Sequence, residues 1–308
     1  MRLVLIALLL LMVPSPNAQD RRAARASALV PDGFDVQGHR GARGLLPENT
    51  LPAFARALAL GVTTLELDLA VSADRELVVS HEPWMSAEIC RLPDGRPISP
   101  DEEQDFKLFQ MDYAEIAAFD CGSSGHPRFP EQQPQPARKP LLREVFALGE
   151  AYAARTGRPV FYNVETKTRP GRDGVFHPEP EAFVRLIAAE ANRAGTGHRT
   201  TLQSFDVRTL QAADRLDLPF RLALLVEPDG WAGIGSLAEG VAALGFVPEI
   251  YSPDFQLVTA EAVGEAHRQG VQVLPWTVNE PADMARLQAL GVDGLITDYP
   301  DRTMALGR

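Results

Sequence analysis

The sequence predicts an α/β fold, a (β/α)8 barrel of the TIM type with an inserted subdomain after the hairpin of its second strand. Three observations support this fold class: the size of the chain, nine short apolar runs separated by helical patterns, and one link too short for a parallel crossover. With 308 residues, 45% of them hydrophobic, the chain can bury a barrel-sized core. Length alone would equally suit two small domains, so the other two observations decide.

The nine apolar runs have the length and composition of strands. About five residues separate the second run from the third, whereas a parallel crossover needs a dozen or more. We therefore expect these two runs to form an antiparallel hairpin, which leaves eight parallel strands for the barrel. The runs are residues 34–38, 63–70, 76–80, 160–165, 200–204, 221–226, 249–252, 272–277 and 294–297.

Helical patterns lie between the runs, and the first of them is the clearest. It stops at Gly61, and its apolar residues recur with the spacing of one helix face; they are Leu51, Phe54, Ala55, Leu58 and Ala59. We expect this face to pack on the barrel. Further helices are predicted at residues 181–194, 207–216, 259–269 and 281–290.

Residues 82–140 interrupt this alternation and are predicted to form an insertion on the catalytic face that walls the site and selects substrates. Prolines recur along the segment and forbid long regular elements. It also contains Cys90 and Cys121, the only two cysteines. We expect them to form a disulfide, which closes a loop of about 32 residues and stabilises the fold by about 3.7 kcal/mol. The alternative is two buried free thiols.

The N-terminus has the features of a secretory signal peptide. Met1-Arg2 precedes an apolar run at residues 3–13, which is shorter than the roughly 20 residues that span a bilayer. We predict a signal peptide at 1–18, a lead-in at 19–33 and a barrel domain at 34–308, and we expect export to the periplasm or the medium. No cysteine follows the run and no later segment is sufficiently apolar, so stable membrane anchoring is not expected.

The net charge of −11 disfavours a nucleic acid or an anionic membrane as partner, because both require a positive footprint. A site for an anionic small molecule must therefore supply its own positive charge.

Polar side chains follow the predicted strands at the end where a barrel carries its active site. Glu66 and Asp68 project on the same side of one strand because they are two residues apart, and so do Glu165 and Lys167. Three carboxylates without a thiolate suit one hard cation, Ca²⁺ or Mg²⁺. In the alternative, the carboxylates pair with Arg40, Arg43 and Lys167 and bind no metal.

The remaining residues at this end predict phosphodiester chemistry. A cation with Arg40 and Lys167 would stabilise charge on phosphoryl oxygens. His39 and His81 suit the roles of general acid and base, unless both are plain core histidines. The hairpin is expected to place His81 opposite Glu66. The other histidines are expected on the surface; they are His126, His177, His198 and His267.

Taken in order, the motifs resemble the glycerophosphodiester phosphodiesterase family over nearly the whole chain after residue 33. One departure from the family pattern is Glu82, which stands where an aspartate commonly follows the second histidine. The matching motifs are Gly38-His39-Arg40-Gly41, Pro47-Glu48-Asn49-Thr50, Glu66-Leu67-Asp68, His81, Glu165-Thr166-Lys167, Gln203-Ser204-Phe205, Trp276-Thr277 and Gly291-Val292-Asp293-Gly294-Leu295-Ile296-Thr297-Asp298.

The resemblance implies metal-dependent hydrolysis of glycerophosphodiesters to sn-glycerol 3-phosphate and an alcohol, through a cyclic phosphate. It implies a metal held by Glu66, Asp68 and Glu165, acid/base work by His39 and His81, and phosphate binding by Arg40 and Lys167. Glu48, Asn49 and Gln203 would support these groups, and Trp276 and Phe205 would line the substrate. The two aromatic residues also suit plain rim packing, Asn49 also suits a helix N-cap, and Asp298 also suits a strand-end role.

Two rival functions remain open at the level of the sequence. A lyase-type phosphodiesterase would release the cyclic phosphate, and a non-catalytic barrel would only bind glycerophosphodiesters or a protein. The sequence leaves the head-group alcohol, the choice of metal and the oligomeric state undecided.

Overall fold

The structure is a computed structural model that describes residues 25, 29–230 and 233–306. The predicted signal peptide at 1–18 and most of the predicted lead-in lie outside these residues.

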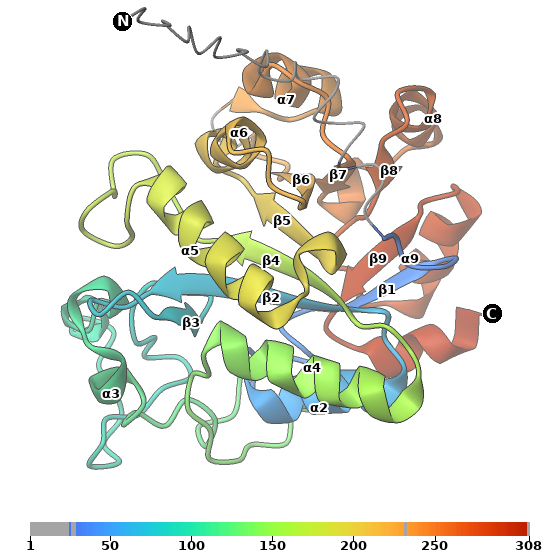
Figure 1. Cartoon of the computed structure of the whole chain (residues 1–308). Coiled ribbons are helices and arrows are strands. Elements are labelled where there is room, and N and C mark those ends of the chain that lie inside the picture. The colour runs from blue at the N-terminus through green and yellow to red at the C-terminus, as the bar shows by residue number, and fades with distance from the viewer. Residues whose placement is uncertain (1–24, 26–28, 231–232, 307–308) are drawn as a thin grey trace, which may run out of the picture.

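Eight parallel strands form a nearly closed barrel with helices around it (Figure 1), which confirms the predicted fold class. The strand order is β8-β7-β6-β5-β4-β2-β1-β9, and β3 pairs with β2. Backbone hydrogen bonds from Ile296 N to Pro275 O and from Val278 N to Ile296 O, both 2.9 Å, close the gap beside β8. The strands are β1 (Asp35–Gly38), β2 (Thr64–Val71), β3 (Leu77–Val79), β4 (Phe161–Thr166), β5 (Thr200–Ser204), β6 (Arg221–Val226), β7 (Ile250–Pro253), β8 (Gln272–Val273) and β9 (Gly294–Thr297).

The helices agree with the predicted pattern and add three that were not predicted, α3, α4 and α7. α2 buries Ala53, Phe54, Ala57 and Leu58. Of the five residues expected on its packed face only Phe54 and Leu58 are buried, and Ala55 and Ala59 are exposed, so the buried stripe is rotated from the predicted one. The helices are α2 (Leu51–Leu60), α3 (Tyr113–Ile116), α4 (Leu142–Thr156), α5 (Pro180–Ala194), α6 (Val207–Arg215), α7 (Leu237–Leu244), α8 (Ala260–Arg268) and α9 (Pro281–Ala289).

The hairpin of β2 and β3 exists, but its register differs from the prediction by one residue. The paired residues are Leu69 with Val79 and Val71 with Leu77, and Ser80 N donates to Asp68 O at 2.9 Å. The predicted pairing of Glu66 with His81 is therefore wrong. The cause is the turn, which has three residues because Ser72 N bonds to the carbonyl of residue 76 and Arg75 takes a left-handed φ of 64°.

The lead-in is anchored to the barrel by Arg25. Its guanidinium is buried between Asp214, at 2.8 Å, and Glu249, at 3.2 Å.

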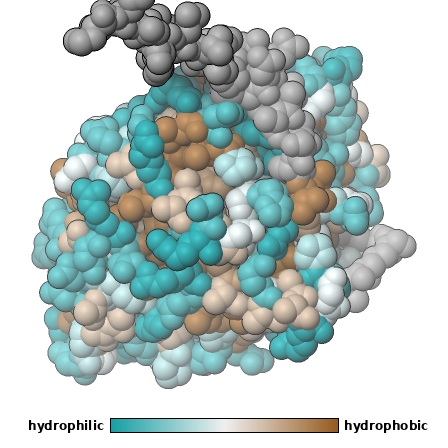
Figure 2. All heavy atoms as spheres, in the orientation of Figure 1, coloured by the Kyte–Doolittle hydropathy of each residue, from teal (hydrophilic) through white to brown (hydrophobic). Residues whose placement is uncertain are grey.

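Figure 2 shows a mostly hydrophilic face with hydrophobic residues grouped between the polar ones. Among the described helices, none has the length and apolar content that crossing a bilayer requires.

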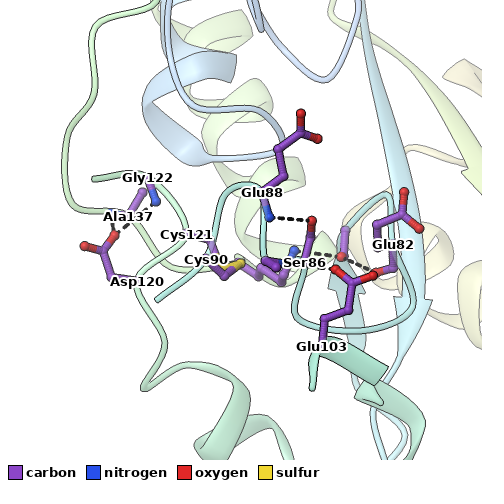
Figure 3. Close-up of a disulfide and its surroundings, with 12 residues drawn as sticks. Glu82, Ser86, Glu88, Cys90, Glu103, Asp120, Cys121, Gly122 and Ala137 are labelled. Carbon is purple, nitrogen blue, oxygen red and sulfur yellow. Dashed lines mark hydrogen bonds between the residues drawn. A yellow bond between two sulfur atoms is a disulfide. The ribbon is translucent and has the colours of Figure 1, made fainter. Parts of the chain in front are cut away.

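The segment after β3 has a small core of its own, beside the end of the barrel where β3 lies (Figure 1). Cys90 and Cys121 form a disulfide within this core, as predicted. Figure 3 shows it beside the loop in which Asp120 Oδ1 accepts hydrogen bonds from Gly122 N at 3.0 Å and Ala137 N at 3.1 Å. The disulfide and these bonds hold a segment with little regular structure against the rim of the barrel.

Candidate active site

The turn after β1 brings His39 and Arg40 to the rim of the barrel. Arg40 has a φ of 50° and Gly41 a φ of 87°. A Cβ at Gly41 would lie 2.7 Å from the backbone carbon of Ala53, so only glycine fits between the turn and α2. The backbone N–H of Arg40 then donates to Glu66 Oε2 at 2.8 Å. The glycine thus fixes the position of a histidine, an arginine and a carboxylate.

Three buried carboxylates meet where β2 and β4 lie side by side. Asp68 and Glu165 are direct neighbours in the parallel register, and one oxygen from each of Glu66, Asp68 and Glu165 lies within 4.8 Å of the others. Burial and repulsion from Asp68 raise the pKa of Glu66 well above its usual value, and burial raises the pKa of Glu165 to about 7. Glu66 and Glu165 resist ionisation in this way, and a hard divalent cation would offset the charge of the ionised cluster.

Two positively charged side chains contact this cluster in the structure. Lys167 Nζ lies 2.6 Å from Glu165 and 3.0 Å from Asp68, and Arg40 Nε lies 3.1 Å from Asp68. Although burial acts in the opposite direction, Lys167 and Arg40 hold the pKa of Asp68 well below its usual range. Lys167 and Arg40 therefore form the ion pairs with the carboxylates that were considered from the sequence, whereas Arg43 pairs with Asp298 and Glu48.

The residues after the turn support the cluster from behind. Glu48 Oε1 accepts from Arg40 Nη1 at 2.8 Å. Asn49 Nδ2 donates to Asp68 Oδ2 at 2.8 Å, and Asn49 Oδ1 accepts from the Asp68 backbone at 3.3 Å. The N-cap of α2 is Thr50, whose hydroxyl accepts from Ala53 N. The N-cap reading of Asn49 is therefore wrong, because this amide holds a carboxylate instead.

Gln203 supports Glu66 from inside the barrel. Its Nε2 donates to Glu66 Oε1 at 2.6 Å. Its Oε1 accepts from Asn163 Nδ2 at 3.0 Å, and the same nitrogen donates to Gln37 Oε1 at 2.7 Å. A chain of buried amides thus runs from the barrel interior to Glu66 and satisfies hydrogen bonds that burial would otherwise leave unmade.

His39 is oriented by a carboxylate from the last strand. Its Nδ1 lies 2.7 Å from Asp298 Oδ1, which also accepts from Arg43 Nε at 2.8 Å, and Asn279 donates to Asp298 Oδ2 at 2.8 Å. An ionised carboxylate has no proton to donate and can only accept hydrogen bonds. His39 Nδ1 therefore carries the proton, and its Nε2 keeps a lone pair. Burial and the charge of Arg43 lower the pKa of His39 to about 4. Sequence reasoning missed this role of Asp298.

His81 has an equivalent partner in the next residue. Its Nδ1 lies 2.7 Å from Glu82 Oε1, so the glutamate reaches the imidazole despite the departure from the family's aspartate. Burial and the charge of Arg40 lower the pKa of His81 well below its usual value. Each of the two histidines therefore has a carboxylate at Nδ1 that orients its ring.

The candidate residues line a cleft with two lobes. The first lobe, about 320 Å³, contains His39, Arg40 and Glu66 together with insertion residues. The second lobe, about 380 Å³, extends past the loop after β4. Asn49 and Asp68 lie behind the lining. The residues that line both lobes are His81, Glu82, Glu165, Lys167, Phe205 and Trp276.

The two aromatic residues pack on each other at the rim and also face the cleft. Phe205 and Trp276 pack edge to face with ring centres 5.5 Å apart, and Trp276 Nε1 donates to Ser252 O at 2.8 Å. Both also line the cleft. Rim packing therefore holds the two rings in place as walls of the cleft.

The insertion contributes groups that the sequence did not single out. Lys139 lines the first lobe, donates to Ser80 Oγ at 2.8 Å, and has a pKa lowered to about 8 by burial. His126 is buried and lines the same lobe, and His177 is buried in the loop after β4. The surface expectation was wrong for these two histidines and right for His198 and His267, which are exposed. The position of Lys139 before Pro140, where the insertion rejoins the barrel, was the available signal.

Comparison with known proteins places this geometry in one family. The model of the glycerophosphoryl diester phosphodiesterase family matches residues 39–302. A glycerophosphodiester phosphodiesterase of Bacillus subtilis is 28% identical over 290 residues, which cover 91% of this chain and 88% of the relative. A glycerophosphodiester phosphodiesterase of Caldanaerobacter subterraneus is 29% identical over 274 residues, which cover 89% of this chain and 97% of the relative.

Solved structures agree with this comparison. A Silicibacter pomeroyi protein, provisionally named a glycerophosphoryl diester phosphodiesterase, has a TM-score of 0.79 at 35% identity and covers 91% of this chain and 94% of its own. An Oleispira antarctica phosphodiesterase in complex with the product sn-glycerol-3-phosphate has a TM-score of 0.67 at 21% identity, covering 92% of this chain and 98% of its own. The second likeness concerns the fold alone.

Proposed function

Since this chain belongs to the glycerophosphoryl diester phosphodiesterase family and is a glycerophosphodiester phosphodiesterase, we propose that it hydrolyses its substrates with one divalent cation and two histidines. The products would be sn-glycerol 3-phosphate and an alcohol. One observation carries the proposal: three buried carboxylates within 4.8 Å share a cleft with His39 and His81, each oriented by a carboxylate.

Glu66, Asp68 and Glu165 would hold the cation, Ca²⁺ or Mg²⁺, which when bound supplies Lewis-acid stabilisation of phosphoryl charge. Arg40 and Lys167 line the same cleft and would bind the phosphoryl oxygens. The side chains of Arg40 and Lys167 both contact the carboxylates in this structure. Their positive charges, which offset the negative charge of the carboxylates, would therefore also lie close to a bound phosphate.

The two histidines would divide the proton transfers. The glycerol 2-hydroxyl attacks phosphorus and gives its proton to Nε2 of one histidine, while the other protonates the leaving alcohol oxygen. A water molecule then opens the cyclic phosphate with the roles reversed. The lowered pKa of His39 supplies a neutral base at pH 7, and an anionic phosphodiester beside the imidazoles would raise the pKa of the one that acts as acid.

We also propose that the protein acts outside the cytoplasm. The predicted signal peptide at 1–18 and the Cys90–Cys121 disulfide both suit export to an oxidising compartment.

The decisive experiment is a coupled assay of sn-glycerol 3-phosphate release after chelation, with Ca²⁺ and Mg²⁺ restored separately. We expect activity to be lost and then regained with one of the metals, and the His39→Ala and His81→Ala variants to lose about 10²- to 10⁴-fold in kcat. Full activity in chelator, with no metal found by elemental analysis, would refute the metal site. Phosphorus NMR tests the rival lyase: a cyclic phosphate that persists as the final product would replace hydrolysis.

A further inference from the structure

The second lobe of the cleft extends away from the catalytic groups toward the surface. Its outer wall comes from the loop after β4, with Arg169, Arg172 and Phe176, and from Trp84 at the start of the insertion. It joins the first lobe at His81, Glu165 and Lys167, which line both lobes. A phosphodiester has two ester arms, so two lobes that diverge from one phosphoryl position suit one arm each.

The charge of this outer wall is positive. Within the described part of the chain, neither Arg169 nor Arg172 has a carboxylate at ion-pair distance. Arg208, near the same loop, is by contrast bound to Asp173 and Asp206, both at 2.7 Å. One carboxylate, Glu227, lines the lobe away from the catalytic groups. Two guanidinium groups that form no ion pair with a described residue, beside one carboxylate, give this wall a local positive potential on a chain whose net charge is −11.

The aromatic residues of this wall are arranged around protein cations. Arg172 Cζ lies 5.0 Å from the ring centre of Phe176, and Lys107 Nζ lies 5.5 Å from it. Trp84 packs edge to face on the same ring, with centres 5.8 Å apart. Because these groups already surround the ring of Phe176, it is not free to form a cage for a quaternary ammonium group.

We propose that the second lobe binds the alcohol arm of the substrate and selects alcohols that carry an anionic group, a phosphate or a carboxylate, through Arg169 and Arg172. This inference rests on the proposed function, since it assigns the substrate class of the same cleft. Arginine suits the role because its planar donors bind both oxygens of such an anion.

Two substrates differ in the charge of the arm. From sn-glycero-3-phosphoglycerol the leaving alcohol is neutral glycerol, whereas from 1,3-bis(sn-glycero-3-phospho)glycerol it carries a phosphodiester anion. We compare kcat/KM for the two, corrected for the two equivalent ends of the second, by release of sn-glycerol 3-phosphate. Wild type should favour the anionic arm, and sn-glycero-3-phosphocholine should be the poorest of the three substrates.

Removal of the charges should change the ratio of the two kcat/KM values. Each of Arg169→Gln and Arg172→Gln should lower it about fivefold, the scale of one partly solvated charge pair, and Glu227→Gln should raise it. As controls, Arg185→Gln and Arg193→Gln on the exposed face of α5 each remove one positive charge, as each test variant does, and should leave the ratio unchanged. Addition of 0.5 M salt should reduce the wild-type preference, because the wall is open to solvent.

The outcomes separate this inference from the proposed function. If the arginine variants keep the wild-type ratio, or wild type prefers the choline ester, the second lobe does not select anions, although the enzyme still hydrolyses glycerophosphodiesters. If no substrate yields sn-glycerol 3-phosphate with either metal, the proposed function itself is refuted.

Discussion

The Asp298→Asn substitution tests how His39 is activated. Asp298 is buried, and its Oδ1 lies 2.7 Å from His39 Nδ1. The amide keeps the shape of the side chain and removes the charge. At a charge separation of about 4 Å and an effective dielectric constant of about 20, that charge stabilises a histidinium by about 4 kcal/mol. Because the histidinium forms only during proton transfer, kcat should fall roughly a thousandfold while KM changes little.

The assay is release of sn-glycerol 3-phosphate at saturating substrate and metal. The matched control is Asp293→Asn, because Asp293 Oδ2 lies 3.0 Å from His267 Nε2 and forms a second aspartate–histidine pair outside the cleft. The control should keep the wild-type kcat. Urea unfolding of both variants establishes that they are folded. A folded Asp298→Asn enzyme with kcat within tenfold of wild type would refute the orienting role of Asp298.

Four further predictions concern stability and binding. Arg25→Met should lower the unfolding free energy by about 3 kcal/mol in urea, because two buried carboxylates lose their partner. Replacing Cys90 and Cys121 by alanine should lower it by up to about 3.7 kcal/mol; no change would mean that the disulfide constrains nothing. The excess stability of wild type over His39→Gln should be complete above pH 6.5 and be lost as the pH falls toward about 4, since the unfolded histidine takes up a proton that the folded one, with its pKa lowered to about 4, resists. Ca²⁺ affinity measured by calorimetry should rise as the pH rises through about 7, because the pKa of Glu165 is raised to about 7 and its proton competes with the cation; a flat profile would contradict this.

The sequence was informative about the fold and the carboxylates because both follow from strand geometry. Side chains two residues apart share one face, and parallel strands of a barrel end at one rim, so the meeting of Glu66, Asp68 and Glu165 required no tertiary detail. The short link between the second and third runs likewise required a hairpin, whichever turn was used.

The remaining parts depend on details that a single sequence does not encode locally. The register of His81 depended on one extra turn residue with the left-handed φ of Arg75. The run at 272–277 forms only a two-residue strand, because Pro275 cannot donate to a ladder. Asp298 and His39 are 259 positions apart, and their contact depends on side-chain orientation after barrel closure.

The closure of the barrel also sets an order of events during synthesis. Glu66, Asp68 and Glu165 all precede β5, whereas Asp298 follows β9, which pairs with β1 through Thr297 and Gly38. A chain that ends before β9 therefore possesses every carboxylate of the cluster but lacks the group that orients its base. We expect a protein truncated before β9 to have no turnover. Catalytic activity therefore requires the last strand of the barrel, which is synthesised after every carboxylate of the cluster.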